Sequence, residues 1–470
     1  MATVEITHFA FGCKTVVDHK IALVIDQDKG GYKYVLVNRL SGHFSSGKNK
    51  HTTMAPISTA KEDATADLDS AIAKLASLKV IGAKEFKKTV KTGSSASWVE
   101  KLPAPARARY EKYGIDLSKG YPKVPEISQI PKFVDEAFAL RNEEFPYIER
   151  GKNADPEKKA LFGAAKEVRN LTKHIGTEIV GLQLADLNDK QKDELALLIA
   201  ERVVVFFRDQ DLSPQKQLEL GKYWGQVEVH AQVPRVPDTK DGEALPGITV
   251  IWQDYAREFY GIPLTYKNSI GGTAQWHTDL VHEFQPAGIT HLHNDTIPEV
   301  GGDTVWASGY AAYDKLSPAF QKFLDGKTAI YRSAHLYLDR ENPLNGPKHI
   351  EREHPLVRTH PATGWKYLFV NRAMTVRIVG LQPKESELIL EYLFGLFERN
   401  LDIQVRWNWK SKPGYGTSAI WDNRISQHNA VWDHEGLEPR HGTRVTALAE
   451  VPYFDPSSKS QREALGLSLD

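Results

Sequence analysis

Ile420-Trp421-Asp422-Asn423-Arg424 is one of many short β-rich runs between Gly271 and Pro452, and this pattern decides the fold class. The runs are separated by Gly, Pro, Asn and Asp, and a single clear helix is predicted from Lys384 to Arg399. Many short strands around one helix favour a closed or double-sheet β fold over a parallel, doubly wound sheet.

Upstream of this region, the sequence predicts two helices around one buried strand. Residues 189–201 have helical periodicity, and Val203-Val204-Val205-Phe206-Phe207 has the apolar character of a fully buried strand. A second helix is expected from Ser213 to Trp224, since Ser213 is a good N-cap and proline follows at the first helical position. Gly225 should end it.

The N-terminal third differs from the rest of the chain in its sequence pattern. Two β-branched runs, Ile21 to Ile25 and Tyr34 to Val37, flank Gly30-Gly31 and predict a hairpin. Met54 is a candidate functional start, which would make the residues before it an appendage. Prolines recur between Lys101 and Pro156, so we expect irregular chain there that packs on the surface of a domain and has no core of its own. The predicted parts are an uncertain appendage (1–53), a helical and irregular extension (54–165), a β domain (166–455) and a solvated C-terminal tail (456–470).

Charge and cysteine content exclude several classes of protein. The chain of 470 residues carries 60 basic and 60 acidic side chains, so no net charge attracts nucleic acid or an acidic membrane surface. Its longest apolar run, Leu195 to Ala200, is far shorter than the ~20 residues that span a bilayer. Cys13 is the only cysteine, which excludes an intrachain disulfide and Cys-based metal sites. A reducing compartment is expected, with the cytoplasm as the default location.

The segment Trp276-His277-Thr278-Asp279 contains the first candidate metal ligands. In extended chain, residues i and i+2 project to the same face, so His277 and Asp279 can reach one metal ion together. Two imidazoles and one carboxylate on one face of an octahedron form the arrangement used for non-haem Fe(II). A His-x-Asp pair is weak evidence alone, because it needs a third ligand and arises by chance in many long chains.

With these motifs in view, the chain from about Gly176 to Leu448 resembles the taurine dioxygenase family of Fe(II)- and 2-oxoglutarate-dependent dioxygenases, especially its fungal sulfonate-oxidising members. The resemblance implies a mainly β fold with peripheral helices, a double-stranded β-helix or cupin-like jelly roll. It assigns His277 and Asp279 as iron ligands and supplies His428 as the third. The matching segments are 203–210, 276–279, 286–288, 301–309, 368–371 and 420–424.

The resemblance also assigns two arginines in Arg440-His441-Gly442-Thr443-Arg444. A spacing of four places both guanidiniums on one face of a strand, where two cations are costly unless anions lie opposite. In the family, the residue matching Arg440 binds the distal carboxylate of 2-oxoglutarate together with the threonine matching Thr304. The residue matching Arg444 receives the anionic head of the substrate. The planar fork of arginine suits both tasks.

The family's substrate contacts match this sequence less closely. His230 corresponds to the histidine that binds the sulfonate. Three neighbouring pocket positions depart from the family pattern, since Val233 stands in place of a tyrosine, Thr273 in place of an asparagine and Met374 in place of an aromatic residue. Such a pocket should accept a different alkyl chain, so taurine is not fixed as the substrate.

Other histidines and aromatic residues have simpler interpretations. His291 and His293 alternate as metal ligands would, but core polarity or pocket lining is the favoured interpretation. His434 and His441 compete with His428 for the third ligand position, and His434 is expected in a solvated loop between acidic residues. The aromatic residues Trp407, Trp409 and Trp421 are expected to be core anchors, and the lysine-rich patch 84–91 a solvated helix face.

The implied reaction hydroxylates the carbon that bears a sulfonate, with Fe(II) as cofactor and with 2-oxoglutarate and molecular oxygen as co-substrates. Succinate and carbon dioxide would be released, and the hydroxysulfonate would collapse to an aldehyde and sulfite. The same chemistry on a sulfate ester, an aryloxy carboxylate or a biosynthetic acid is the competing enzymatic interpretation. A non-catalytic jelly-roll binding protein is the second class. The sequence leaves open the alkyl chain and whether the chain forms a homo-oligomer.

Overall fold

The structure is a computed structural model that divides into two compact units, residues 1–70 and 71–470. It describes residues 2–6, 19–26, 31–38, 96–123, 143–230, 233–239, 244–260, 276–337, 348–431, 433–434 and 438–468. The positions of Thr273 and Met54 and the lysine-rich patch 84–91 lie outside these residues.

The first unit contains a three-stranded antiparallel sheet in the order β1-β2-β3. Its strands are β1 (Ala2–Ile6), β2 (His19–Asp26) and β3 (Gly31–Asn38). β2 and β3 pair in register from His19 opposite Asn38 to Asp26 opposite Gly31, which confirms the predicted hairpin.

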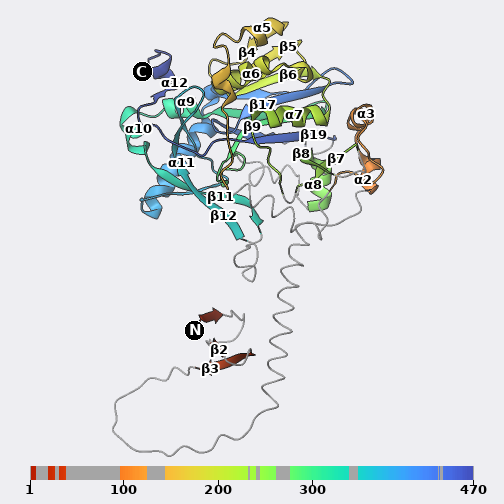
Figure 1. Cartoon of the computed structure of the whole chain (residues 1–470). Coiled ribbons are helices and arrows are strands. Elements are labelled where there is room, and N and C mark those ends of the chain that lie inside the picture. The colour runs from red at the N-terminus through yellow and green to blue at the C-terminus, as the bar shows by residue number, and fades with distance from the viewer. Residues whose placement is uncertain are drawn as a thin grey trace, which may run out of the picture. The chain divides into compact units, whose positions relative to one another are not determined.

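The second unit is built on an eight-stranded sheet whose neighbouring strands are mostly distant in the sequence (Figure 1). Its pairs are antiparallel except β5 with β6. In spatial order the strands are β4 (Glu167–Asn170), β5 (Thr177–Val180), β6 (Val204–Gln210), β17 (Gly416–Asp422), β9 (Ala287–Thr296), β19 (His441–Leu448), β8 (Ala244–Trp252) and β7 (Arg235–Pro237).

Three smaller sheets complete the β structure. The first is β16 (Gln404–Trp407), β10 (Thr304–Ser308) and β18 (Ser426–Ala430); the second is β12 (Lys348–Pro355), β11 (Thr328–Tyr337) and β15 (Thr375–Ile378); the third is β13 (Val357–Thr359), β14 (Trp365–Leu368) and β20 (Lys459–Ser460). The predicted mainly β jelly-roll fold with peripheral helices is confirmed.

The predicted helices form where their caps satisfy the first free backbone N–H groups. The three longest in the described part of the chain are α6 (Asp189–Arg202), α7 (Pro214–Trp224) and α11 (Pro383–Arg399). The Ser213 side chain caps α7 and Gly225 follows its last residue, as expected. α6 and α7 cover one face of the eight-stranded sheet (Figure 1). The other helices are α2 (Ala96–Lys101), α3 (Ala104–Lys112), α5 (Lys159–Ala164), α8 (Gln253–Tyr260), α9 (Gly309–Asp314), α10 (Pro318–Leu324) and α12 (Gln461–Ala464), with 3-10 turns η1 (Arg150–Asn153), η2 (Leu184–Asp186) and η6 (Leu401–Ile403).

The main core cluster includes the three tryptophans that the sequence predicts as anchors. Trp407, Trp409 and Trp421 are all buried. The Phe206 ring of β6 stacks on Trp407, with centroids 4.2 Å apart, and so joins the large sheet to the small sheet β16-β10-β18. The candidate site lies in the interior between these two sheets.

Two expectations for the ends of this unit need correction. α3 is regular helix where prolines predicted irregular chain, because Pro103 is its N-cap and Pro105 lies in its first turn, where a backbone N–H is not needed. The expected solvated tail is wrong for Ser460 and Gln461, which are buried where β20 pairs in parallel with β14 and α12 begins. The predicted domain boundaries stay predictions.

Among the described residues, no helix is both long enough and apolar enough to span a bilayer.

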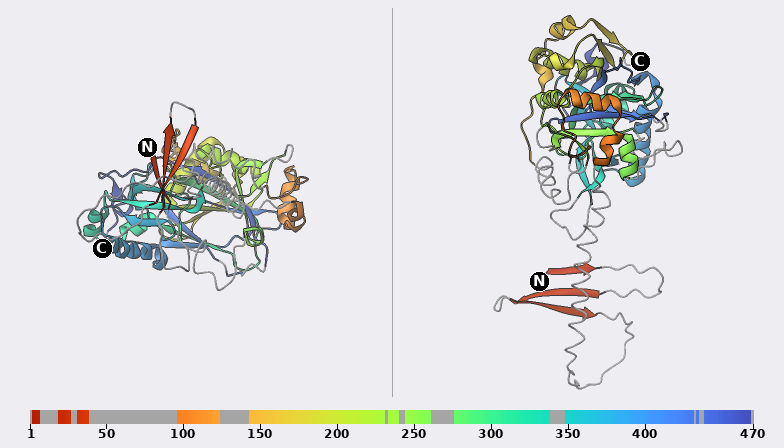
Figure 2. Two further views of the ribbon diagram at one scale, coloured as in Figure 1. Left: turned by 90° about the horizontal axis from the view of Figure 1, so that it is seen from below. Right: turned by 90° about the vertical axis from the view of Figure 1, so that its right-hand side faces the viewer.

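In the second unit, α3 lies against the part of the large sheet that contains β19 (Figure 2).

Candidate active site

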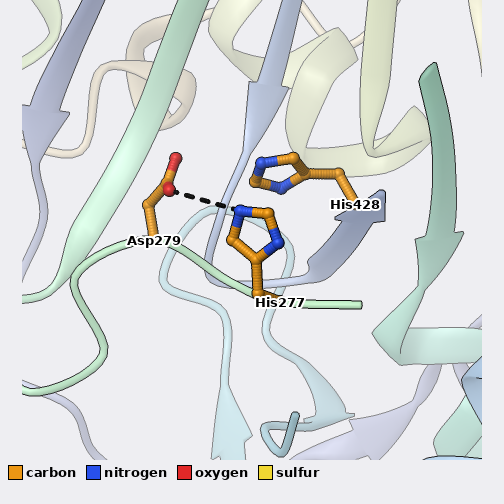
Figure 3. A group of neighbouring side chains, drawn as sticks. All are labelled: His277, Asp279 and His428. Atoms are coloured by element: carbon orange, nitrogen blue, oxygen red, sulfur yellow. Dashed lines mark ion pairs between the residues drawn. The ribbon is translucent and has the colours of Figure 1, made fainter. Parts of the chain in front are cut away.

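Three side chains from two segments of the chain converge at one point in the jelly roll (Figure 3). His277 and Asp279 belong to the segment before β9, and His428 belongs to β18. One ligand atom from each of the three residues lies within 4.8 Å of the other two. His277 Nε2 is 3.8 Å from Asp279 Oδ1, and the two imidazole centroids are 4.2 Å apart. The structure therefore brings together the His277, Asp279 and His428 that the sequence predicts.

Backbone pairing explains why residues so distant in sequence meet here. The N–H of His277 donates to the carbonyl of His428 at 3.1 Å, and the N–H of His428 donates back at 2.9 Å. Between the two ligands of the first segment, the Thr278 hydroxyl donates to the Ser426 carbonyl at 2.7 Å. The first segment is thus held along β18, with the side chains at i and i+2 on the same side.

Asn423 fixes the position of the carboxylate ligand. Its Oδ1 accepts a hydrogen bond from the Asp279 backbone N–H at 3.2 Å, and its Nδ2 donates to the Thr290 hydroxyl at 2.6 Å. Sequence reasoning included Asn423 in a motif but gave it no role. The sequence carries no pattern for this role, which depends on the burial of an amide whose polar atoms all need partners.

The charge states of Asp279 and His428 suit a metal. Burial lowers the pKa of His428 to about 3, so this imidazole is neutral at physiological pH. Burial alone would raise the pKa of Asp279, but Arg444 and the two histidines hold it below its ordinary value. His428 Nδ1 is buried with no hydrogen-bond partner among the described residues. Two imidazoles and one carboxylate are the donor set of the facial triad that binds Fe(II), so the residues present fit that ion.

Arg440 lies beside Thr304 and is almost completely buried. Its exposed fraction is 4%, and its Nη2 donates to the Thr304 hydroxyl at 3.4 Å. Burial lowers the pKa of Arg440 to about 10, which still leaves it charged at neutral pH. Across the described part of the chain, Arg440 forms no ion pair and its Nε has no hydrogen-bond partner. A buried cation that forms no ion pair is costly, so this position suits an anionic ligand.

Trp409 also contacts this position. Its indole Nε1 donates to the Thr304 hydroxyl at 3.2 Å, and the Arg440 guanidinium lies 5.8 Å from its ring. The sequence predicted only a core anchor here. The missed signal is that a buried indole N–H needs an acceptor.

Arg444 reaches the metal ligands directly. Its Nη1 is 3.3 Å from Asp279 Oδ2, and its Nε is buried without a hydrogen-bond partner among the described residues. The side chain is 23% exposed, so it is more accessible than Arg440. Arg444 in β19 and Arg440 just before that strand therefore have different surroundings.

The predicted substrate contacts are only partly located. The His230 side chain is buried and its ring centroid lies 6.2 Å from that of Tyr337, while its carbonyl accepts from Arg235. Met374 is buried in the main core cluster, and Val233 is half-buried at the start of the described stretch 233–239. Their roles, like that of Thr273, stay predictions.

The competing histidines have other partners. His291 Nε2 and His293 Nδ1 both lie 2.9 Å from the Ser418 hydroxyl, which confirms core polarity. His441 is bonded to Asp295 at 2.7 Å. The expectation that His434 lies in a solvated loop is wrong, because it is buried and lies 2.6 Å from the Gln253 side chain.

The fold and the triad together define a jelly-roll metalloenzyme class with a facial His-Asp-His site. Residues 167–446 match the family model described as "Taurine catabolism dioxygenase TauD, TfdA family". The match covers more than half of the chain, and the chain therefore belongs to this family of dioxygenases.

Individual relatives agree with this assignment. A Saccharomyces cerevisiae protein named "Alpha-ketoglutarate-dependent sulfonate dioxygenase" is 36% identical over 294 residues, which cover 62% of this chain and 68% of that protein. A Pseudomonas putida "Alpha-ketoglutarate-dependent sulfate ester dioxygenase" is 32% identical over 301 residues, covering 61% and 90%. The solved structure of a taurine dioxygenase from Burkholderia xenovorans is 29% identical with a TM-score of 0.50, and covers 62% of this chain and 92% of that one.

Proposed function

We propose that this protein is an Fe(II)- and 2-oxoglutarate-dependent dioxygenase that hydroxylates the carbon next to a sulfonate. The products would be succinate, carbon dioxide, sulfite and an aldehyde. The observation that carries the proposal is a buried arginine, Arg440, held near Thr304 in the same jelly roll as a complete His-Asp-His triad. The sulfonate dioxygenase of S. cerevisiae supports the choice of substrate class.

The triad would hold the iron through His277, Asp279 and His428, which together occupy one side of the ion. When bound, the ferrous ion supplies the oxygen chemistry that no amino-acid side chain can perform. The chain contributes a neutral imidazole at His428 and an ionised carboxylate at Asp279. Both are already in the protonation state that a metal ligand requires.

Arg440 and Thr304 would bind the distal carboxylate of 2-oxoglutarate. A carboxylate would accept hydrogen bonds from the guanidinium and the hydroxyl and would neutralise the buried cation. The Thr304 hydroxyl already accepts a hydrogen bond from Trp409, which leaves its own proton available for a ligand. The co-substrate would thereby be oriented at one end before reaction.

Arg444 and His230 would bind the anionic head of the substrate. Arg444 keeps one group of donors on Asp279 and has a buried Nε available for a sulfonate oxygen. Fixing the anion fixes the distance from the head group to the carbon that is oxidised, so binding energy is used for position and regioselectivity. The single cysteine fits the reducing cytoplasm that we propose as its location.

A second candidate substrate is a sulfate ester, because the P. putida relative is named for that activity. Aryloxy carboxylates and other organic acids are further alternatives with the same iron chemistry. The purified protein should be incubated aerobically with Fe(II), 2-oxoglutarate and a panel of alkylsulfonates, alkyl sulfates and aryloxy acids. We expect succinate together with sulfite on alkylsulfonates; succinate with sulfate would identify the ester as substrate.

The control for this assay is His277→Ala, with His291→Ala as a matched histidine outside the triad. We expect loss of succinate formation in the first variant and retention in the second. Wild-type protein that consumes no oxygen with any member of the panel would contradict the enzymatic proposal and favour a non-catalytic binding protein.

A further inference from the structure

β19 contains Arg444, and Arg440 immediately precedes it. Between the two arginines, His441 and Thr443 both contact a buried polar cluster, since His441 bonds to Asp295 and Thr443 accepts a hydrogen bond from Arg109. Both His441 and Thr443 are fully buried. What holds His441 and Thr443 therefore also sets the rotation of the backbone between the arginines.

The residues that hold His441 and Thr443 come from α3 and the segment after it. Arg109 of α3 donates to Asp295 at 3.0 Å and to the Thr443 hydroxyl at 3.1 Å. Its Nε donates to the Leu212 carbonyl at 2.8 Å. One side chain of the N-terminal extension is thus connected to β9, to β19 and to the start of α7.

His441 lies at the centre of a continuous chain of hydrogen bonds. Its Nδ1 is 2.7 Å from Asp295 Oδ1, and its Nε2 contacts the Tyr121 hydroxyl. The Tyr110 hydroxyl is 2.9 Å from that of Tyr121. One arrangement satisfies every group: His441 donates from Nδ1 to the carboxylate and accepts from Tyr121, which in turn accepts from Tyr110.

The charges in this network are balanced. Burial alone would raise the pKa of Asp295, but His441 and Arg109 hold it below its ordinary value. Thr443 is further held by Gln217 of α7, which accepts from its hydroxyl at 2.5 Å and donates to its carbonyl at 2.8 Å. A buried network with this many hydrogen bonds fixes geometry, since a displacement leaves further polar groups without a partner.

We propose that Arg109, Tyr121 and Asp295 are positioning residues that orient β19, so that Arg440 and Arg444 present their guanidiniums to the two anionic ligands. This inference rests on the roles given to those arginines under the proposed function. It makes residues 96–123 part of the binding machinery, although none of them belongs to the 167–446 match to the family. The segment acts through His441 and Thr443.

The test compares two tyrosines of the same segment. Tyr121→Phe removes the hydroxyl that contacts His441, and Asp295→Asn removes the charge between His441 and Arg109. Tyr113→Phe is the matched control, because its hydroxyl bonds to Asp211 at 2.5 Å and has no part in the network. Each full-length variant is loaded with Mn(II), which does not support turnover, and its Kd for 2-oxoglutarate is measured by calorimetry.

We expect Kd to rise about tenfold in Tyr121→Phe, the worth of one buried hydrogen bond, and to change less than about twofold in Tyr113→Phe. Thermal unfolding is measured alongside, since a merely structural role would lower Tm and leave Kd unchanged. Such a result for Tyr121→Phe would overturn the proposal. If Asp295→Asn fails to fold, Tyr121→Phe decides alone.

Amide hydrogen exchange of β19 separates this inference from the proposed function. Without any ligand, we expect faster exchange across residues 441–448 in Tyr121→Phe than in wild type or Tyr113→Phe. If wild-type protein does not bind 2-oxoglutarate, the proposed function fails, while the exchange result still decides the positioning role. Equal exchange in all three proteins would overturn it.

Discussion

Arg424 and Arg440 are both buried arginines of the same jelly roll, and their surroundings are opposite. Arg424 is 1% exposed and contacts Glu149 at 2.7 Å, Glu450 at 2.8 Å and Asp422 at 2.6 Å. Arg440 is 4% exposed and forms no ion pair with any described residue. A buried charge that the chain pairs with acidic side chains is structural, whereas one that forms no ion pair indicates a ligand site.

The same contrast appears in the protonation behaviour. Burial works against the charge of Arg424, yet Asp422 and the surrounding acidic groups raise its pKa well above the ordinary value. For Arg440, burial dominates and lowers the pKa to about 10. The comparison teaches that distance to acidic groups, and not burial alone, separates the two kinds of arginine.

The largest expected effect is on stability at the paired arginine. Arg424→Met would leave Asp422 and Glu149 buried without their arginine, while Glu450 keeps Arg358, so the free energy of unfolding should fall by about 3–5 kcal/mol. Urea unfolding measures this loss. A decrease below about 1 kcal/mol would show that the ion pairs of Arg424 do not stabilise the fold. The contrast drawn between Arg424 and Arg440 would then fail.

Arg440→Met should have the opposite profile. The free energy of unfolding should stay equal or rise, because an unpaired buried charge is replaced by an apolar side chain of similar length. The Kd for 2-oxoglutarate should rise by about 30-fold to 1,000-fold, as expected when one partner of a buried charge pair is truncated. Calorimetry on Mn(II)-loaded protein measures it, and unchanged binding in a folded variant would contradict the assignment.

His291 is a third kind of buried group, because its side chain is uncharged in the folded state. Its contribution to stability should therefore depend on pH. Burial, with Arg109 nearby, lowers the pKa of His291 from 6.5 to about 3. The unfolded chain therefore binds a proton that the folded chain does not, and the stability contributed by neutral His291 is lost as pH falls below about 6.5 toward about 3. The slope for one such histidine is about 1.4 kcal/mol per pH unit.

The test follows urea unfolding between about pH 6.5 and 4.5 for wild type and for His291→Asn. The variant should lose stability less steeply with acid, by about one proton, although its stability at pH 7 is lower. Identical slopes would mean that His291 is protonated in the folded protein.

Arg444→Ala should give the smallest effect, since this arginine is partly exposed and keeps Asp279 as a neighbour. We expect KM for the sulfonate to rise about tenfold, with 2-oxoglutarate turnover persisting without sulfite release. Steady-state assays of succinate and sulfite measure the two products separately. A rise in KM for 2-oxoglutarate equal to that for the sulfonate would contradict the division between Arg440 and Arg444.

The sequence predicts the periodic elements and the residues that share one motif. The helices at α6, α7 and α11 follow from caps and periodicity, and His277 with Asp279 follows from the i and i+2 geometry of extended chain. His428 could be assigned only through resemblance, because it lies 149 positions after Asp279 and strand pairing at that range cannot be predicted from one sequence.

The residues that support the site were harder to predict. Asn423 acts through a backbone N–H, and Trp409 acts through one indole nitrogen, so neither shows a pattern in the sequence. The burial of Ser460 depends on the pairing of β20 with β14, and a short polar segment gives no pattern that predicts this pairing. These contacts depend on tertiary structure and not on local propensity.

The most direct test of the central claim is calorimetric titration of the full chain with Mn(II) in place of Fe(II). We predict one ion bound per chain in the wild type, its loss in His428→Ala, and its retention in His434→Ala, whose histidine lies outside the triad. Undiminished binding of one ion by His428→Ala would contradict the claim that His277, Asp279 and His428 form the metal site.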